Sequence, residues 1–502
     1  MEKETNKKVI VIGAGVAGLS AGIHALQSGF DVTIYEQHNI PGGNSTSWKR
    51  EAYLFEGAMH WVTGSGPNKA LHKLWRNVGV INDDTKMYFQ KQYFSLNYKG
   101  QQVSFYRNLA EFQKHLLEIS REDEKAIALL CKEIKMFSVF DMPITDIKGV
   151  KVKEKEKSSL SSLLAMLPAL SKMKKYNNMS VSEYVTAFKS PAIRAFLENC
   201  LGKDIIAFNL LVTLGQLASE DGAYIEGGSL ALAFNMEKRF VSLGGTICYN
   251  QKVDKVLVEK QEVSGVVVQG KEVSCLAVIV ASDTISAVDG LFDQALIDDQ
   301  WILQMKENTK DRIMACTFIS LGLQVDLSEY PSSLSFFLDQ PFKYADTEVS
   351  ALGFHQYSAY PEYAPKGCTA MTVVLMGDTY DYWLALKKQG SYEQEKKRLA
   401  QEVITILTEK LPVIKDKIAV IDVATPLTYQ RYCNTYRGGW MNNMKKGDKM
   451  TNYPQVSKSV KHLYFAGQRM MTPGGLPVAL FTGRQAVQYL CKNSDIVFQA
   501  KL

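Results

Sequence analysis

The N-terminus carries the pattern that most restricts the fold, an apolar strand that runs directly into a glycine-rich turn. Residues 9–12 (V-I-V-I) are all β-branched, which is typical of a strand buried in a parallel sheet. The turn that follows reads G-A-G-V-A-G. In it, Gly13 permits a tight turn, Gly15 lets the backbone approach a pyrophosphate, and Gly18 allows close packing of a helix on the strand. The segment therefore predicts a strand, a phosphate-binding turn and a helix over about 16–28.

A second strand and a terminal acid complete a dinucleotide-binding pattern. Gly29 ends the expected helix, and residues 32–35 form the next expected strand. Glu36 closes that strand, 23 positions after Gly13, where an acidic side chain hydrogen-bonds the hydroxyls of a bound ribose. The glycine turn alone is a weak signal, because a simple packing turn gives it too. The full order of strand, turn, helix, strand and acid indicates a nucleotide site.

Two further glycine-containing segments bear on which dinucleotide is bound. Residues 41–46 (P-G-G-N-S-T) follow the second strand and add a backbone surface for a diphosphate or a ribityl chain. Far along the chain, residues 463–465 predict a short strand, and 473–477 a turn into a helix over about 478–491. The positive end of that helix suits the N1 and O2 region of a flavin, where negative charge collects on reduction.

These segments together resemble the flavin-containing amine oxidase superfamily. Residues 53–64 (YLFEGAMHWVTG) and 425–443 (TPLTYQRYCNTYRGGWMNN) are similar to its phytoene desaturase, carotenoid isomerase and retinol saturase branch. The resemblance covers most of the chain, thinly between about 80 and 215, and implies that FAD is the cofactor. Two residues depart from the family pattern: Asn44 stands where many relatives carry arginine, and Gln468 where an acid is often found.

The resemblance implies an α/β fold in which a Rossmann-like FAD-binding domain is assembled from discontinuous segments and joined to an α+β substrate domain with a mixed sheet. The FAD-binding segments are expected at 1–78, 219–300 and 455–502. The substrate segments are expected at 79–218 and 301–454. Locally, a hairpin is predicted around Gln261 and an amphipathic helix over 391–412.

The expected cofactor contacts come from all three FAD-binding segments. They are Gly13, Gly15, Val16, Ala17, Gly18, Glu36, Gln37, Gly42, Gly43, Asn44, Ser45, Met59, His60, Val253, Gly467, Gln468, Gly475, Leu476 and Pro477. As the resemblance implies, Val253 would act through its backbone at the adenine. No metal site is expected, because the eight cysteines form no C-x-x-C pair and none lies beside histidines at ligand spacing.

His60 and Arg437 are the candidate catalytic residues. The resemblance places His60 in a stretch that leads towards the flavin ring, and an imidazole with a pKa of about 6.5 can shuttle a proton or polarise a carbonyl. The alternative is a histidine packed against Trp61 that orders the pocket. Arg437 precedes a glycine pair and either stabilises an anionic group or forms a structural salt bridge. The other histidines, His355 among them, show no partner pattern and are expected to be structural or solvated.

Composition and charge restrict the compartment and the partners. The net charge of +6 over 502 residues is a mild bias and does not indicate a nucleic-acid binder. Widely spaced cysteines favour reduced thiols in a cytoplasmic protein. Glycines interrupt the uncharged stretch 9–30, which argues against a signal peptide or membrane anchor.

Residues 158–176 leave two interpretations open. Leucines recur at helical spacing, and Lys172, Lys174 and Lys175 follow them. A helix with an apolar stripe and a basic end can lie on an anionic bilayer, which would make the protein a peripheral membrane protein. The alternative is an ordinary helix that faces the core and is kinked at Pro168.

The expected function is that of an FAD-dependent oxidoreductase acting on a long apolar unsaturated substrate. The resemblance implies a carotenoid, a retinoid or an unsaturated lipid, and desaturation, saturation or flavin-assisted double-bond isomerisation through hydride exchange at flavin N5. No second G-x-G-x-x-G follows a later strand, so a separate acceptor or donor such as oxygen or a quinone is expected. The alternatives are an amine oxidase, or a flavoprotein that binds lipid or a partner without turnover.

Overall fold

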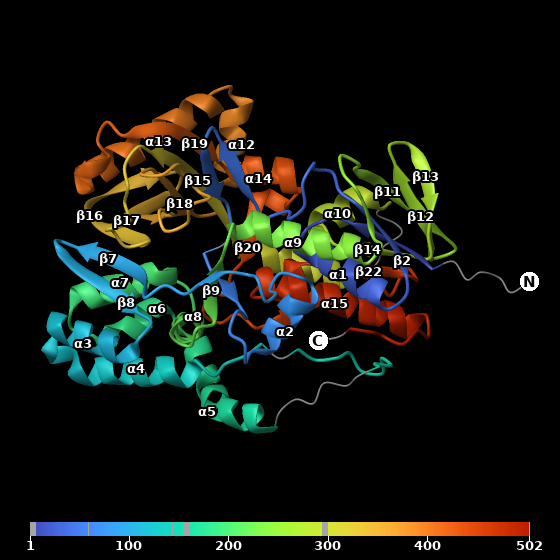
Figure 1. The fold of residues 1–502 in the computed structure, drawn as a ribbon, viewed down its shortest axis with the longest axis horizontal. Coiled ribbons are helices and arrows are strands. Elements are labelled where there is room, and N and C mark those ends of the chain that lie inside the picture. The colour runs from blue at the N-terminus through green and yellow to red at the C-terminus, as the bar shows by residue number, and fades with distance from the viewer. Residues whose placement is uncertain (1–6, 59, 143, 154–159, 294–299, 501–502) are drawn as a thin grey trace, which may run out of the picture.

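The computed structural model describes residues 7–58, 60–142, 144–153, 160–293 and 300–500. Its strands form two main sheets that lie side by side, with helices around both (Figure 1). One sheet carries the N-terminal strand and turn, and the other belongs to the segments expected to bind substrate.

A five-stranded sheet holds the predicted nucleotide site. Its order is β10-β2-β1-β14-β22, and every neighbouring pair is parallel. The strands are β1 (Lys8–Ile12), β2 (Asp31–Tyr35), β10 (Thr246–Cys248), β14 (Ala277–Val280) and β22 (Leu463–Phe465). Three segments far apart in the sequence therefore build one Rossmann-like sheet, which confirms the predicted assembly from discontinuous pieces.

Helices pack closely on the first helix of this unit because glycine stands at their contacts. The helices are α1 (Val16–Gln27), α9 (Gly228–Ser242) and α15 (Leu476–Asn493). A Cβ added to Gly483 would lie 2.4 Å from the carbonyl oxygen of Ala17, and one added to Gly22 would lie 2.6 Å from the ring of Phe240. The helices that open and close the chain thus lie against each other (Figure 1).

A small antiparallel sheet follows α9 and β10. It consists of β11 (Val253–Glu259), β12 (Glu262–Val268) and β13 (Lys271–Ser274). The predicted hairpin is confirmed, with φ of 50° at Lys260 and 62° at Gln261 in its turn. The sequence pattern does not predict β13. Helices α10 (Thr284–Leu291) and α11 (Gln300–Thr309) then lead to the second sheet.

The second sheet is mixed, as predicted. Its order is β19-β15-β18-β17-β16-β7-β8, with β20 paired to β15, and only the pairing of β16 with β7 is parallel. The strands are β7 (Gln92–Tyr98), β8 (Gln101–Tyr106), β15 (Ile313–Leu323), β16 (Ser333–Tyr344), β17 (Thr347–Gln356), β18 (Thr369–Met376), β19 (Ile418–Ala424) and β20 (Gly439–Asn442).

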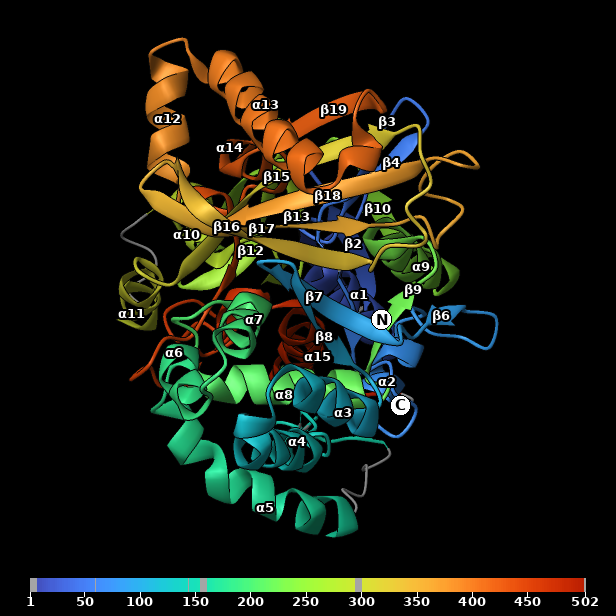
Figure 2. The same cartoon turned by 90° about the vertical axis from the view of Figure 1, so that its left-hand side faces the viewer.

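Helices cover both sides of this sheet. Above it in Figure 2 lie α12 (Tyr380–Lys388) and α13 (Tyr392–Lys410), the latter being the predicted amphipathic helix, with α14 (Pro426–Cys433) behind them. Below it lie α3 (Leu109–Ile119), α4 (Glu124–Phe137), α5 (Leu160–Asn177), α6 (Val181–Tyr184), α7 (Pro191–Leu201) and α8 (Ala207–Ala218). The lower helices share a hydrophobic core of their own with β7 and β8.

Short elements join the two halves of the molecule. They are α2 (Ala70–Asn77), β3 (Ser47–Arg50), β4 (Tyr53–Glu56), β5 (Val62–Thr63), β6 (Met87–Tyr88), β9 (Gly222–Ile225), β21 (Thr451–Asn452) and β23 (Met471–Thr472). Among the described helices, none combines the length and the apolar character that crossing a bilayer requires. The domain boundaries themselves stay a prediction.

Candidate functional site

The glycine-rich turn has the geometry that a phosphate group requires. Gly13 has a φ of 100°, which a residue with a Cβ rarely adopts. A Cβ on Gly18 would lie 1.9 Å from the carbonyl oxygen of Gly13, so only glycine allows α1 to start this close to the strand. Helix α1 begins at Val16, and its N-cap residue, Gly15, has no side chain that could cap the first amides. The first amides of α1, including that of Ala17, are therefore placed to hold an anion.

The second glycine pair forms a backbone surface directly beside this turn. Gly15 and Gly42 pair as an isolated parallel bridge, and the Gly42 amide donates to the carbonyl of Ala14 at 2.9 Å. Gly42 and Gly43 have φ of 114° and 57°. A Cβ added to Gly15 would meet only the Gly42 carbonyl oxygen within 4 Å, at 3.8 Å, so any larger side chain would enter the open space between the two loops.

Glu36 lies at the end of β2 with its carboxylate turned back towards the turn. It accepts hydrogen bonds from the amides of Ala14 at 2.7 Å and His38 at 2.8 Å. Burial raises the pKa of Glu36, and these amide donors act in the opposite direction. Its neighbour Gln37 donates to the carbonyl of Tyr432 at 3.2 Å.

Two amide side chains from opposite ends of the chain hold the Gly439–Trp440 backbone. Asn44 Nδ2 lies 3.2 Å from the Gly439 carbonyl oxygen, and Gln468 Nε2 lies 3.0 Å from that of Trp440. These are the two residues that depart from the family pattern. The amide oxygens of both, like the hydroxyl of Ser45, are buried and have no partner within the described protein. Buried polar groups are normally hydrogen-bonded, so these atoms fit a site that is completed by a bound group.

A single cavity of about 1890 Å³ brings most of the predicted contacts together. This exceeds the ~300–1,000 Å³ of an ordinary small-ligand pocket and leaves room for a dinucleotide and a second ligand. The predicted residues that line it are Gly13, Gly15, Val16, Ala17, Glu36, Gln37, Gly42, Gly43, Asn44, Ser45, His60, Val253, Gly467, Gln468, Gly475, Leu476 and Pro477. Gly18 lies behind the turn, and Met59 falls outside the described residues. The uncapped N-terminus of α15 also faces this cavity, at Gly475.

Arg437 is not among the described residues that line the cavity, and a catalytic role for it stays a prediction. Its guanidinium lies 3.1 Å from Asp378 and 2.8 Å from Asp381, and it stacks over the ring of Tyr380. Both acids belong to the loop and the start of α12, on the outer side of the mixed sheet. The structural salt bridge, the alternative for Arg437, is the observed state. Nearby in the sequence, Thr435 and Trp440 do line the cavity.

His60 faces the cavity and stacks on a second histidine. The ring centroids of His60 and His355 lie 4.1 Å apart with an interplanar angle of 23°, and Trp440 meets His60 edge-on at 6.1 Å. Trp61 is tilted against His60 at 6.4 Å, so the predicted packing also exists. Burial lowers the pKa of His60 to about 4, and burial together with His60 lowers the pKa of His355 well below its usual value. Both imidazoles are therefore neutral near pH 7.

His355 is the main residue that sequence reasoning missed. It lies on β17 with β16 on one side and β18 on the other, and its side chain shares the cavity-facing side of the strand with Ala351 and Gly353. The sequence offers one signal for it, the alternation along β17, in which Leu352, Phe354 and Gln356 are buried and residues 351, 353 and 355 are partly exposed.

A buried carboxylate fixes the segment that leads to His60. Glu56 accepts from the hydroxyls of Tyr224 and Tyr363 at 3.0 Å each, and from the amides of Ser229 and Ala58 at 3.0 Å each. Burial is the main cause that raises the pKa of both tyrosines, and nearby Glu56 adds to it, so they remain donors. His60 is thus positioned by a network that uses no surface group.

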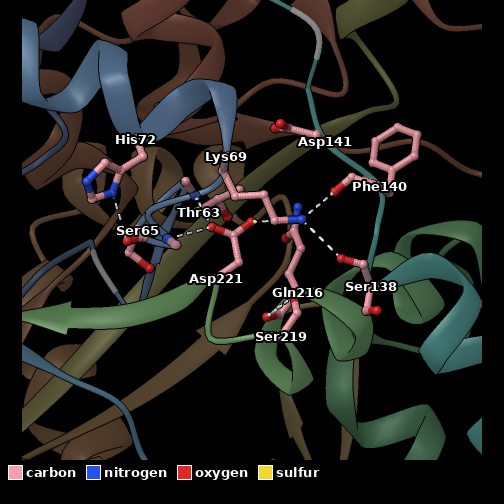
Figure 3. Close-up of polar contacts among 12 residues, drawn as sticks. Thr63, Ser65, Lys69, His72, Ser138, Phe140, Asp141, Gln216, Ser219 and Asp221 are labelled. Carbon is pink, nitrogen blue, oxygen red and sulfur yellow. Dashed lines mark hydrogen bonds and ion pairs between the residues drawn. The ribbon is translucent and has the colours of Figure 1, made fainter. Parts of the chain in front are cut away.

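A second polar network supports residues 64–69, which follow the His60 segment and β5 (Figure 3). Lys69 Nζ donates to the carbonyls of Ser138 and Phe140 at 3.0 and 3.1 Å, and lies 4.0 Å from a carboxylate oxygen of Asp221. Asp221 in turn accepts from the amides of Gly64 and Gly66. Burial raises the pKa of Asp221 to about 6. The network ties the loop after β5 to the end of α4, where Phe140 lines the cavity.

Beyond the histidine pair the cavity continues between the mixed sheet and the lower helices. Its apolar lining includes Trp61, Phe94, Leu201, Ile205, Phe208, Val212, Phe354 and Met444. Among the described residues, no Asp, Glu, Lys or Arg of 58–216 or 314–376 lines the cavity. We call this part the uncharged branch. In the part of the chain that the structure describes, no group of His, Cys, Asp or Glu is arranged to hold a metal ion.

Comparison with known proteins agrees with this geometry. The family model for flavin-containing amine oxidoreductases matches residues 16–491. Three curated relatives are an all-trans-retinol 13,14-reductase of Danio rerio (23% identity; 93% of this chain, 83% of the relative), a 4,4'-diapophytoene desaturase of Methylomonas (21%; 98% and 97%), and a chloroplastic prolycopene isomerase of Daucus carota (23%; 94% and 78%).

A solved oxidoreductase from Methanosarcina mazei shares the fold, with a TM-score of 0.58 at 18% identity over 96% of this chain and all of that one. The residues of the cavity fit the cofactor of the family, since glycine turns, uncapped helix starts and unpaired buried acceptors converge on one space. The chain therefore belongs to the flavin-containing amine oxidoreductase family, and its cofactor is FAD.

Proposed function

We propose that the protein is an FAD-dependent oxidoreductase that acts on a long, uncharged, unsaturated molecule such as a carotenoid, a retinoid or an unsaturated lipid. The observation that carries the proposal is the uncharged branch, because the lining residues of 58–216 and 314–376 are all apolar or neutral, while the charged residues that line the cavity belong to other segments. A cationic amine in this branch would be removed from water without a carboxylate to pair with, which is costly. This argues against an amine oxidase. The three curated relatives act, by name, on retinol, 4,4'-diapophytoene and prolycopene.

In this proposal the chain's own residues perform three tasks. The glycine turns and the starts of α1 and α15 hold the cofactor, which when bound can accept or return a hydride at flavin N5. The apolar walls of the uncharged branch exclude water around the substrate. His60, kept neutral by burial, accepts the proton that desaturation releases or returns the proton that saturation requires. Isomerisation requires no net transfer of a hydride or a proton. A separate acceptor or donor, such as oxygen or a quinone, would complete the redox cycle.

The test is an anaerobic titration of the FAD-loaded protein. We expect a polyene such as all-trans-retinol or phytoene to bleach the oxidised flavin, or to reoxidise flavin reduced beforehand, while putrescine does neither. Reduction by putrescine without any response to polyenes would support the amine oxidase alternative. Polyene binding without any flavin response would instead indicate a lipid-binding flavoprotein without turnover.

The proposal includes contact with a membrane surface through α5, in a protein whose eight free cysteines suit a cytoplasmic location. Leu167 and Leu170 are 55% and 40% exposed, and Lys172, Lys174 and Lys175 follow on the exposed side. We expect the protein to co-sediment with phosphatidylserine vesicles, and Leu167→Ser with Leu170→Ser to weaken this at least about tenfold, since each buried leucine side chain contributes about 1.5–3 kcal/mol. Binding that is unchanged in the double variant would contradict a role for α5.

A further inference from the structure

The cavity-facing side of α8 is polar although the rest of the helix is built into an apolar core. Asn209, Val212, Thr213 and Gln216 line the cavity, and their spacing of three and four residues places them on one face of the helix. On the other faces, the leucines of α8 are fully buried in the lower core. We call Asn209, Thr213 and Gln216 the polar stripe. Its three side chains are all neutral and all carry hydrogen-bonding groups.

Other neutral polar groups from nearby elements line the same cavity. Ser333 and Ser335 of β16 line it, and Asn199 of α7 donates to the Ser335 hydroxyl at 3.0 Å. Asn177, at the end of α5, also lines the cavity, and its side-chain oxygen is buried without a partner among the described residues. The polar stripe therefore belongs to a larger set of neutral donors and acceptors at an otherwise apolar cavity.

From this set we infer that the substrate carries an uncharged hydrogen-bonding group at one end, a hydroxyl or a carbonyl, which the polar stripe binds. The inference rests on the proposed function and specifies its substrate class. A pure hydrocarbon would displace water from the stripe without replacing its hydrogen bonds. A carboxylate would be buried in the uncharged branch with no cation to pair with it. An alcohol or a carbonyl satisfies the stripe and leaves its apolar chain against Phe208, Ile205 and Trp61.

The inference also gives the stripe a positioning role. An anchored end group fixes how far the polyene extends along the branch, and so determines which of its double bonds lies at the histidine pair. A protein site that hydrogen-bonds a polar group of the substrate discriminates strongly against an analogue that lacks this group. When the analogue binds, the polar atoms of the site are left without a hydrogen-bonding partner.

The experiment compares ligands that differ only at the end group, on the FAD-loaded protein. The probes are all-trans-retinol, the same polyene with a methyl group in place of its CH₂OH group, and retinoic acid. Lycopene and 1-hydroxylycopene provide the same comparison for a longer chain. Affinity is read from quenching of tryptophan fluorescence, since Trp61 and Trp440 line the cavity. We expect the alcohol of at least one pair to bind about tenfold more tightly than its hydrocarbon, and retinoic acid to bind more weakly than retinol.

Variants of the polar stripe test whether it causes the preference for the alcohol over the hydrocarbon. Thr213→Val combined with Asn209→Leu is expected to bring the alcohol and the hydrocarbon within about twofold of each other, because two of the three hydrogen-bonding side chains of the polar stripe are replaced by apolar ones of similar volume. Both residues are only half-buried, and FAD content per protein checks that the fold is intact. Thr405→Val makes the same chemical change on the exposed face of α13 and is expected to leave the preference unchanged.

The outcomes separate this inference from the proposed function. Hydrocarbons that bind the wild-type protein as tightly as their alcohols would overturn the inference, as would a preference that survives in the double variant. In both cases the flavin would still respond to polyenes in the anaerobic titration. If no polyene binds and none changes the flavin spectrum, the proposed function fails, and the inference fails with it.

Discussion

The Gly15→Val variant is expected to purify without bound FAD. The valine side chain would extend into the space between the Gly15 and Gly42 loops, where the nearest protein atom to a new Cβ is 3.8 Å away. It would block the approach of a diphosphate to the first amides of α1. Losing two hydrogen bonds to a charged group costs about 3–6 kcal/mol, which raises Kd by a factor of about 10²–10⁴. The ratio of visible flavin absorbance to protein absorbance measures the effect.

Gly290→Val is the matched control for this substitution. Gly290 lies in α10, a Cβ added there would meet no atom within 4 Å, and the residue is exposed. This variant is expected to bind FAD as the wild type does. A Gly15→Val protein that keeps its yellow colour would remove the phosphate-binding role from the N-terminal turn.

His60→Ala is expected to retain FAD but to slow reduction of the flavin by substrate about 10²–10⁴-fold, the usual contribution of a positioned proton-transfer group. His60 is one of several residues around the cofactor, so its loss removes the proton acceptor and leaves the glycine cradle intact. Rapid-mixing measurements of flavin bleaching give the rate. His115→Ala, a partly buried histidine that does not line the cavity, is expected to keep the wild-type rate.

The role of His60 as the proton acceptor also predicts how the rate of substrate oxidation depends on pH. Burial lowers the pKa of His60 to about 4, so the neutral, proton-accepting form is present throughout the range above that value. The rate of substrate oxidation is expected to be flat between about pH 6 and 8 and to fall only as the pH approaches the lowered pKa. A profile that breaks near the ordinary value of about 6.5, or unchanged kinetics in His60→Ala, would return His60 to a packing role against Trp61.

Local patterns allowed most of the nucleotide-binding part to be predicted from the sequence. The order of strand, glycine turn, helix and Glu36 is short-range, and each residue type there answers a backbone requirement, such as the positive φ of Gly13. The C-terminal helix start at Gly475 carries a similar local signature, with Pro477 in its first turn.

The substrate side was much less predictable, because its residues meet only in three dimensions. His355 becomes a partner of His60 only when β17 passes over the loop after β4, and nothing near His355 in the sequence signals this. In the sequence, the segment that carries the polar stripe is typical of an ordinary amphipathic helix. Only the structure shows that its half-buried polar face lines a cavity. Arg437 illustrates the reverse case, since its family-like surroundings suggested the flavin while its side chain pairs with Asp378 and Asp381.

One cavity is proposed to hold FAD together with a long uncharged substrate. The most direct measurement is the visible spectrum of the purified protein, followed by extraction and mass-spectrometric identification of everything bound. We expect a flavin spectrum, release of FAD, and a co-purified polyene or other unsaturated lipid that carries a neutral oxygen. A protein that shows no flavin spectrum even after incubation with FAD would contradict the account.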